Sequence, residues 1–268
     1  MITFEDNPNQ NNIIELRGIS QSYDGGANWI IQDLDLLIED KPDQGQFVVV
    51  LGMSGSGKST LLRYIAGLQQ PTTGTVHING KPTSESERVS MVFQQYSSLP
   101  WKTVLENVAL GLEFQGMSRK DRLDKAMELI ELVGLAGHEH KYAQYPSLSG
   151  GQLQRVAIAR SLLANPKILL MDEPFGALDI KTRLRMQDLL TDIWHKFQST
   201  IVFVTHDISE AVYLGDDIYI LKSQPSKIAE HIKVELPIVR NRQTKRDPQY
   251  VSLVHKVEDA MVAVSDLG

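Results

Sequence analysis

The sequence predicts an α/β fold in which a parallel β-sheet forms the core, and three observations support this prediction. Short apolar segments rich in branched residues alternate with helical stretches in the second half of the chain, as in βαβ units. Near residue 50, a buried strand leads through a glycine-rich loop directly into a helix. Between these two parts lies a long stretch with helical periodicity, which predicts a mainly helical middle.

The first third of the chain is predicted to be rich in strands. These segments are short, contain branched or aromatic residues and are flanked by Gly, Asp or Pro; they cover residues 13–16, 34–38, 47–51, 75–78 and 89–93. One helix is expected among them, at residues 60–68, where apolar residues recur at helical spacing. The break at residues 69–74 ends that helix.

Helices are predicted for the middle of the chain, and strands and a closing helix for its end. Thr103 with Glu106 and Ser118 with Asp121 have the spacing of helix N-termini, and residues 95–164 are expected to be mostly helical. Compact strands are then predicted at residues 168–171, 201–204 and 218–221. The polar, basic segment 237–248 is interpreted as a solvated connector, with a phosphate- or partner-binding role as the alternative, and residues 250–264 as a closing amphipathic helix.

Composition excludes several classes of protein. The chain of 268 residues carries 27 Lys and Arg against 33 Asp and Glu, a formal charge of −6, which argues against a broadly basic nucleic-acid binder. It contains no cysteine, so disulfides, thiol nucleophiles and zinc-thiolate sites are excluded. No apolar run approaches the roughly 20 residues of a membrane helix, and the N-terminal residues lack the pattern of a secretory signal.

A phosphate-binding loop is predicted at residues 52–60, Gly-Met-Ser-Gly-Ser-Gly-Lys-Ser-Thr, between a buried strand and a helix. The glycines allow backbone N–H groups to point at phosphate oxygens, and the helix N-terminus adds positive charge. Lys58 supplies a charge for the terminal phosphates, the Ser59 hydroxyl is suited to Mg²⁺, and Thr60 to an inner phosphate. The full predicted binding set of the loop is Gly52, Ser54, Gly55, Gly57, Lys58, Ser59 and Thr60.

Polar side chains also follow two later strands. The strand at residues 168–171 ends in Asp172 and Glu173; the first is suited to Mg²⁺ and the second to accepting a proton from an attacking water as a general base. His206 follows the strand at residues 201–204, where it could donate a hydrogen bond to the terminal phosphate. The other histidines, including His138 and His140, are interpreted as surface or packing residues.

A second anion site is predicted at residues 148–152, Leu-Ser-Gly-Gly-Gln. Ser149 is expected to cap the helix that follows, and Gln152 to reach back to it in a capping box. A capped helix start with two glycines exposes N–H groups and a hydroxyl, which suits a phosphate.

Together these motifs resemble the ATP-binding cassette (ABC) family of transport ATPases, over roughly residues 13–221. The resemblance also includes Gln94 in Met-Val-Phe-Gln-Gln, Asp179 in Ala-Leu-Asp, and Tyr23, which lies where the family has an aromatic residue stacked on adenine. Trp29 is the less favoured alternative. The resemblance implies a P-loop NTPase core with a parallel sheet, an N-terminal antiparallel β subdomain and an inserted α-helical subdomain.

The resemblance also implies domain boundaries. Residues 1–12 are expected to form a disordered lead-in and residues 13–236 the ABC ATPase domain, with the helical subdomain at about residues 95–164. Residues 237–268 would form a C-terminal connector and helix.

The family further implies a head-to-tail pair of cassettes that encloses two ATP molecules with Mg²⁺. Catalysis would depend on Glu173, His206 and Gln94, and the metal on Ser59, Gln94 and Asp172, all acting within one chain. Ser149, Gly151 and Gln152 would contact the nucleotide held by the opposite subunit. Asp179 would communicate between the two sites.

The expected partners are a second copy of the chain or a homologous ATPase, separate transmembrane permease subunits and a solute-binding protein, with no nucleic acid. The chain would act peripherally on the cytoplasmic face of the cell membrane. Segments 99–108, 175–179 and 205–212 resemble the importers of nitrate, sulfonate, taurine and bicarbonate. The alternative within the family is an ATPase for a lipid or efflux system.

Two other classes are less well supported by the sequence. Soluble cassette proteins of translation or DNA repair typically contain two cassettes or a long coiled coil, and this chain has one cassette and no sustained heptads. A scaffold without ATPase activity is disfavoured because every catalytic position carries a competent side chain.

Overall fold

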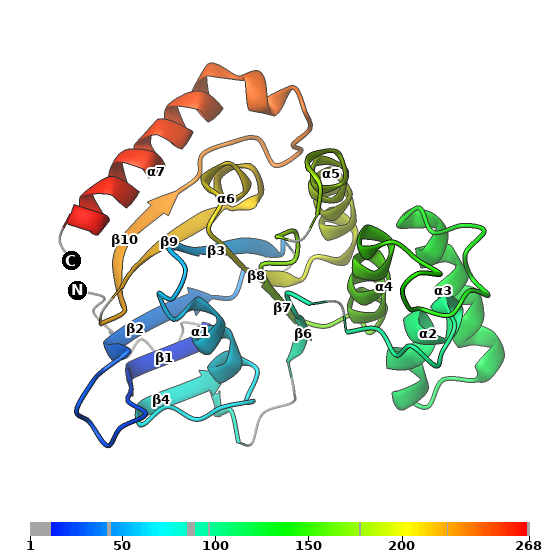
Figure 1. Cartoon of the computed structure of the whole chain (residues 1–268), viewed down its shortest axis with the longest axis horizontal. Coiled ribbons are helices and arrows are strands. Elements are labelled where there is room, and N and C mark those ends of the chain that lie inside the picture. Colours follow the sequence, from blue (N-terminus) through cyan, green and yellow to red (C-terminus); the bar gives the residue numbers. More distant parts are fainter. Residues whose placement is uncertain are drawn as a thin grey trace. The chain divides into compact units, whose positions relative to one another are not determined.

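The computed structural model describes residues 12–41, 44–84, 89–95, 97–176, 178–223 and 225–266 (Figure 1). Two compact units make up the chain: the first unit is Met1–Val89 with Thr200–Gly268, and the second unit is Ser90–Ser199. The expected disordered lead-in lies outside the described residues, apart from Asn12, which begins the first strand. The expected domain boundaries stay predictions.

The first unit contains an antiparallel sheet, as the resemblance to ABC ATPases implied. Its strands are β1 (Asn12–Gln21), β2 (Ile31–Glu39), β4 (Thr73–Ile78) and β5 (Lys81–Pro82). They lie in the order β2-β1-β4-β5, and every neighbouring pair is antiparallel. Ile14, Leu16 and Ile19 of β1 are fully buried, because the apolar side chains of the sheet share one core.

Parallel strands form the other sheet region of the first unit. They are β3 (Gln46–Gly52), β8 (Thr200–Thr205) and β9 (Asp217–Lys222), joined by β10 (Lys227–Lys233). β3 pairs in parallel with both β8 and β9, whereas β10 pairs antiparallel with β9. All residues of β3 and β8 are buried, which explains their uninterrupted apolar sequences. The sequence did not predict β10, because this strand is mostly polar and exposed.

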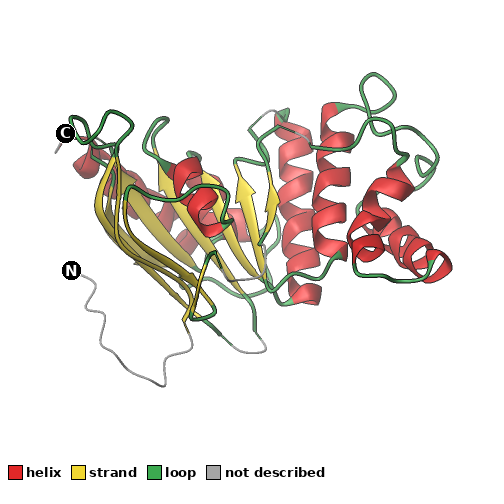
Figure 2. Cartoon of the chain, turned by 90° about the horizontal axis from the view of Figure 1, so that it is seen from below, coloured by secondary structure: helices red, strands yellow, loops and turns green. Residues whose placement is uncertain are grey.

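Helices complete both units, and Figure 2 distinguishes helices, strands and loops by colour. The first unit has α1 (Lys58–Ile65), α6 (Ile208–Leu214) and α7 (Pro248–Asp266). The second unit has α2 (Val104–Phe114), α3 (Arg119–Leu132), α4 (Gly150–Leu163) and α5 (Ile180–Phe197), with the parallel strands β6 (Ser90–Val92) and β7 (Ile168–Asp172). The predicted N-caps are confirmed: Thr103 caps α2 in a capping box with Glu106, and Ser118 caps α3.

The segment interpreted as a solvated connector is anchored to the first unit. Arg240 is only 5% exposed; its guanidinium donates to the backbone oxygens of Tyr213 (3.1 Å) and Gly215 (2.8 Å) and to Asp216 Oδ1 (2.8 Å). Lys245 Nζ lies 4.2 Å from the centre of the Tyr213 ring. The interpretation was therefore wrong for Arg240, which joins the carbonyl groups at the end of α6 to a carboxylate. Figure 1 shows α7 beside α6 and β10 in the same unit.

Replacing Arg240 with Ala should lower the free energy of unfolding by about 2–4 kcal/mol, since two carbonyls and a carboxylate lose their donor. Urea unfolding followed by circular dichroism measures this loss. Arg246→Ala, at an exposed residue six positions along the same basic segment, is the matched control and should change the stability by less than about 0.5 kcal/mol. Equal effects of the two substitutions would contradict an anchoring role for Arg240.

Candidate active site

The loop between β3 and α1 curls in a way that only glycine permits. Gly55 and Gly57 have φ angles of 80° and 82°, in the left-handed region that other residues avoid. A Cβ atom on Gly52 would lie 2.6 Å from Ser56 Oγ and 3.0 Å from the backbone oxygen of Leu221. The loop therefore brings its backbone N–H groups into a tight turn at the carboxyl end of β3, as the sequence predicted.

Lys58 is held inside this loop. Its side chain is only 4% exposed, and Nζ donates to the backbone oxygens of Gly52 (2.8 Å) and Met53 (2.9 Å). The N-terminus of α1 begins at Gly57 without a side-chain cap, and no acidic residue lies in its first turn. Its N–H groups and the ammonium group thus combine into a site suited to an anion with several oxygens.

No sequence pattern marks Ser226, a residue that supports the loop through hydrogen bonds. Ser226 is 1% exposed; its Oγ donates to the Ser56 backbone oxygen (2.8 Å), and its own N–H donates to the Ile30 oxygen (2.7 Å). A Cβ on Gly57 would lie 3.0 Å from Ser226 Oγ. Ser226 therefore fixes the loop through backbone contacts, which no short motif records.

His206 lies at the same edge of the parallel strands as the loop. The last residue of β8, Thr205, pairs with Leu51, the residue before Gly52, so His206 follows at the level of the loop. The turn after His206 is fixed because Thr205 Oγ1 donates to the buried Glu210 carboxylate (2.8 Å) and accepts from the Asp207 N–H (3.0 Å). The exposed imidazole is thus presented on a rigid turn.

The two aromatic candidates for adenine stacking differ in exposure. Tyr23 is 65% exposed, and its hydroxyl accepts a hydrogen bond from Gln69 Nε2 (3.0 Å), just beyond the end of α1. Trp29 is half-buried and packs over Gly26, where a Cβ would lie 3.6 Å from its ring. The open ring face of Tyr23 makes it the better candidate of the two.

The acidic residues and Gln94 lie in the second unit. Asp172 ends β7 and is 7% exposed, and Glu173 follows it. β6 runs parallel to β7, so Gln94 emerges at the same end. A Cβ on Gly176 would lie 3.9 Å from Glu173 Oε2 and 4.0 Å from Gln94 Nε2. The side chains of Gln94 and Glu173 therefore both lie close to Gly176 in the second unit.

Glu173 has a backbone conformation that is costly for its residue type. Its φ angle is 42°, in the left-handed region, where a residue with a Cβ pays roughly 1–2 kcal/mol. Such strain persists where the surrounding structure imposes it, and it is concentrated at functional sites.

The start of α4 carries the predicted second anion site. Ser149 caps the helix, with Gln152 N–H donating to its Oγ (3.3 Å), while the Ser149 N–H donates to Gln152 Oε1 (2.8 Å). The predicted capping box is confirmed. Ser149 is exposed at the tip of the helix. The first turn of α4 therefore has a fixed geometry and an open end.

Asp179 lies close to this helix start. It caps α5 by accepting the Thr182 N–H on Oδ1 (3.0 Å), and its hydrogen bonds with Thr182 hold the pKa of the carboxyl group below its ordinary value. A Cβ on Gly151 would lie 2.7 Å from Thr182 Cγ2. Thr182 thus links Asp179 to α4, the signature helix, whose start carries the signature residues 148–152 of the predicted second anion site, so the second unit brings these two predicted site features together.

A further contact that the sequence did not indicate joins the loop after Gln94 to α4. The Arg160 guanidinium donates to the backbone oxygen (2.9 Å) and to Oγ (2.8 Å) of Ser97. Burial lowers the pKa of the Arg160 guanidinium from its usual value. The loop that carries Gln94 is therefore tied to the helix that begins with the signature residues.

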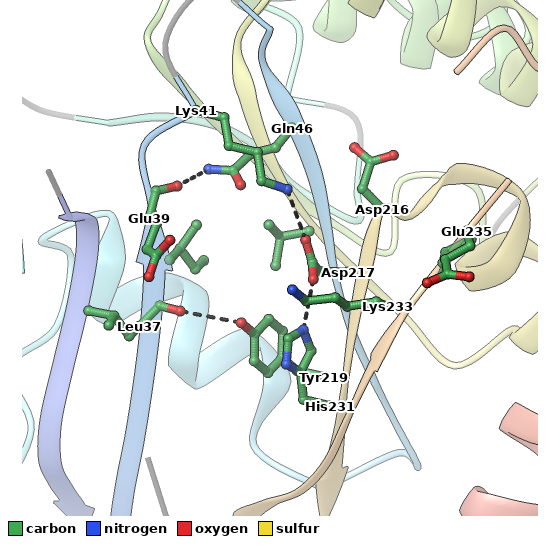
Figure 3. Close-up of a pocket in the computed structure, with 13 residues that line it drawn as sticks. Leu37, Glu39, Lys41, Gln46, Asp216, Asp217, Tyr219, His231, Lys233 and Glu235 are labelled. Carbon is green, nitrogen blue, oxygen red and sulfur yellow. Dashed lines mark hydrogen bonds and ion pairs between the residues drawn. The ribbon is translucent and has the colours of Figure 1, made fainter. Parts of the chain in front are cut away.

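A cavity of about 370 Å³ lies in the first unit at the other end of β3 (Figure 3). Gln46, the first residue of β3, lines it, whereas the phosphate loop follows the last residue of that strand. Asp217 in its wall accepts hydrogen bonds from His231 (2.8 Å) and Lys41 (3.3 Å). This cavity is separate from the loop and contains none of the predicted site residues.

Comparison with known proteins agrees with this geometry. The family model for the ABC transporter matches residues 38–176. The chain belongs to the ABC transporter family. It is 44% identical to a nitrate import ATP-binding protein of Synechocystis, covering 88% of this chain and 90% of the relative, and 42% identical to an aliphatic sulfonates import ATP-binding protein of Bacillus subtilis, covering 91% of each.

A solved structure shows the same fold. The ATP-binding cassette MJ0796, as a dimer bound to ADP and Pi after hydrolysis, matches with a TM-score of 0.70 and 34% identity over 84% of this chain and 100% of that one. The predicted fold class and the predicted ATPase activity are therefore confirmed: the chain is an ABC ATPase that hydrolyses ATP to power transport. Among the described helices, none combines the length and apolar character that crossing a membrane requires.

Replacing Gly151 with Ala should destabilise the second unit by about 1–3 kcal/mol, because the new methyl group would overlap Thr182 Cγ2. Adding Thr182→Ser removes that methyl group, keeps the hydroxyl, and should restore most of the lost stability. Chemical unfolding of the two single variants and the double variant measures the coupling. Additive losses would show that the contact between Gly151 and Thr182 is not the cause.

Proposed function

We propose that this chain is the ATPase subunit of a membrane importer for a small solute of the nitrate, sulfonate, taurine or bicarbonate type. The observation that carries this proposal is the similarity to importer ATPases over nearly the full length. Relatives named for the import of nitrate, aliphatic sulfonates and taurine are 40–44% identical over 83–91% of this chain. The solute itself would bind to other subunits.

In this proposal, ATP is enclosed between two cassettes. The phosphate loop, His206 and Tyr23 of one chain bind the nucleotide, and Ser149, Gly151 and Gln152 of the opposite chain complete the site. Two features support this arrangement: the anion-binding start of α1 lacks a side-chain cap, and the capped start of α4 is exposed at its tip. The solved relative is a dimer with ADP and Pi.

Each residue has a chemical role in this scheme. Lys58 and the N–H groups of the loop bind the phosphate oxygens, and Thr60 contacts an inner phosphate. Glu173 accepts the proton of the attacking water, while His206 donates a hydrogen bond to the terminal phosphate. Asp179 communicates between the two sites of the dimer.

The residues proposed for Mg²⁺ fit this ion. Ser59, Gln94 and Asp172 offer a hydroxyl, an amide oxygen and a carboxylate, the hard oxygen donors that Mg²⁺ prefers. Mg²⁺ at nucleotide sites is usually bound through one or two carboxylates together with phosphates and water, so the single carboxylate of Asp172 is enough. When bound, the ion would neutralise charge on the terminal phosphates.

Gln94 would connect this chemistry to the membrane partners. Its loop is tied to the signature helix through Arg160 and Ser97. We infer that separate permease subunits dock on the second unit, that a solute-binding protein belongs to the same system, and that the chain acts peripherally on the cytoplasmic face of the cell membrane. Closure and release of the dimer then shift the conformational populations of the permease.

Replacing Glu173 with Gln should slow ATP hydrolysis by roughly 10²–10⁴-fold, because a positioned proton acceptor is lost. ATP affinity should be retained, since the substitution leaves the phosphate loop intact. Phosphate release assays and nucleotide titrations measure the two quantities. Glu258→Gln, at an exposed position on α7, is the matched control. Turnover of the Glu173 variant close to that of the unaltered protein would exclude the general-base role.

Reconstitution of the full transporter tests the proposed substrate class. The chain, its permease subunits and its solute-binding protein are placed in proteoliposomes, and ATP hydrolysis is measured with nitrate, taurine, an alkanesulfonate or bicarbonate. We expect one of these solutes to stimulate ATP hydrolysis severalfold. The same solute should accumulate on the side of the membrane on which this ATPase chain lies. Solute movement in the opposite direction, or stimulation by lipid alone, would contradict the importer assignment.

A further inference from the structure

His138, in the loop between α3 and α4, contacts a signature residue. Its Nε2 lies 2.7 Å from Nε2 of Gln152, in the first turn of α4. The sequence predicts a surface or packing role for His138, but the structure places its ring against the helix start that carries the proposed anion site. The question is which of the two nitrogen atoms donates.

The capping box answers this question. Gln152 Oε1 accepts the Ser149 N–H (2.8 Å), so the side-chain oxygen faces the helix start and the NH₂ group faces His138. An amide NH₂ group donates and does not accept. His138 Nε2 must therefore accept, which requires a neutral ring with its proton on Nδ1. A ring protonated on Nε2 would bring two donors to within 2.7 Å of each other.

This arrangement leaves an unpaired atom on the ring. Nδ1 of His138 is buried and has no hydrogen-bond partner among the described residues. An aromatic ring placed only for packing would avoid this unsatisfied donor. The acceptor that Nε2 offers to Gln152 is therefore the feature that distinguishes histidine from a hydrocarbon ring at this position.

The position of His138 is fixed by its backbone. The His138 N–H donates to the Leu135 oxygen, and the His138 oxygen accepts from the Lys141 N–H, each at 3.0 Å. Arg155 of α4 also joins the same loop to the helix: it donates to the Gly134 oxygen (2.9 Å) and to the Gly151 oxygen (3.3 Å). These hydrogen bonds fix the backbone of the loop. The His138 ring is therefore held in a position where it restrains the Gln152 side chain.

We propose that His138 is a positioning residue that locks Gln152, and with it the first turn of α4, in the geometry that receives the nucleotide of the opposite cassette. Both ends of the Gln152 amide are then held, one by Ser149 and the other by His138. The inference rests on the proposed function of the signature in the ATP-bound dimer. Nucleotide binding by an isolated chain does not depend on it.

Three variants of the full chain test this role. His138→Phe keeps an aromatic ring without an acceptor, His138→Gln restores an acceptor oxygen near the place of Nε2, and His140→Phe alters an exposed neighbour. His138→Phe should lower the maximal turnover roughly fivefold, the equivalent of one neutral hydrogen bond, without changing ATP affinity of the dilute monomer. His138→Gln should recover most of the turnover, and His140→Phe should behave as the unaltered protein.

ATP-driven dimerisation supplies a second readout. In the Glu173→Gln background, size-exclusion chromatography should show that His138→Phe needs several times more ATP to dimerise, while His138→Gln does not. Equal loss in both His138 variants, or no loss in His138→Phe, would overturn the proposal.

Nitrogen NMR of histidine-labelled protein provides a test that is independent of activity. The His138 resonances, assigned by their absence in His138→Gln, should show a neutral ring protonated on Nδ1. Protonation on Nε2 would overturn the proposal. Ser149→Arg is measured in parallel: if it leaves turnover intact, the proposed function of the signature fails, whereas failure of the His138 variants alone leaves that function standing.

Discussion

The structure of the site depends on the burial of β3. Its seven residues are all buried, with parallel neighbours on both sides, so the chain can present polar groups to a ligand only where the strand ends. At that point Gly52 leaves no room for a side chain, and Gly55 and Gly57 take the left-handed conformations that turn the N–H groups inward. The phosphate loop, the buried Lys58 and the start of α1 all follow from this one constraint, and Ser226 supports it from the neighbouring turn.

The two helix starts that are proposed to bind anions are built in different ways. The start of α1 has no side-chain cap, which leaves its N–H groups available to phosphate oxygens. The start of α4 is capped by its own Ser149 and Gln152, which fixes the turn and leaves the hydroxyl at an exposed tip. The uncapped start of α1 suits close binding of the phosphates by the chain that holds the nucleotide. The capped start of α4 suits a rigid surface that meets a nucleotide already held by another chain.

Local signals predicted much of this molecule, and the features they missed share a physical cause. The caps at Thr103, Ser118 and Ser149 were predictable because each is decided by residues three positions apart. The roles of Ser226, Arg160 and Arg240 were not predictable. Each of these side chains donates to a backbone carbonyl group at least 25 residues away in the sequence. Any residue type can supply such a carbonyl, so no pattern of side chains marks the partner. β10 was missed for a related reason: as a polar edge strand, it has little apolar alternation to reveal it.

Backbone strain and unpaired polar atoms occur at several residues of the proposed site. Glu173 holds a left-handed backbone, Ser56 Oγ is buried in the phosphate loop without a partner among the described residues, and His138 Nδ1 is likewise unpaired beside the signature helix. Arg240, by contrast, is just as deeply placed but has its hydrogen bonds satisfied, as a structural anchor should. Such costs are retained where function requires them, so these features support the proposed roles of the phosphate loop, Glu173 and His138. Within the described part of the chain, a left-handed backbone also occurs at Asn79 and an unpaired buried atom at His77, so the proposed roles rest on these features only together with the contacts of each residue.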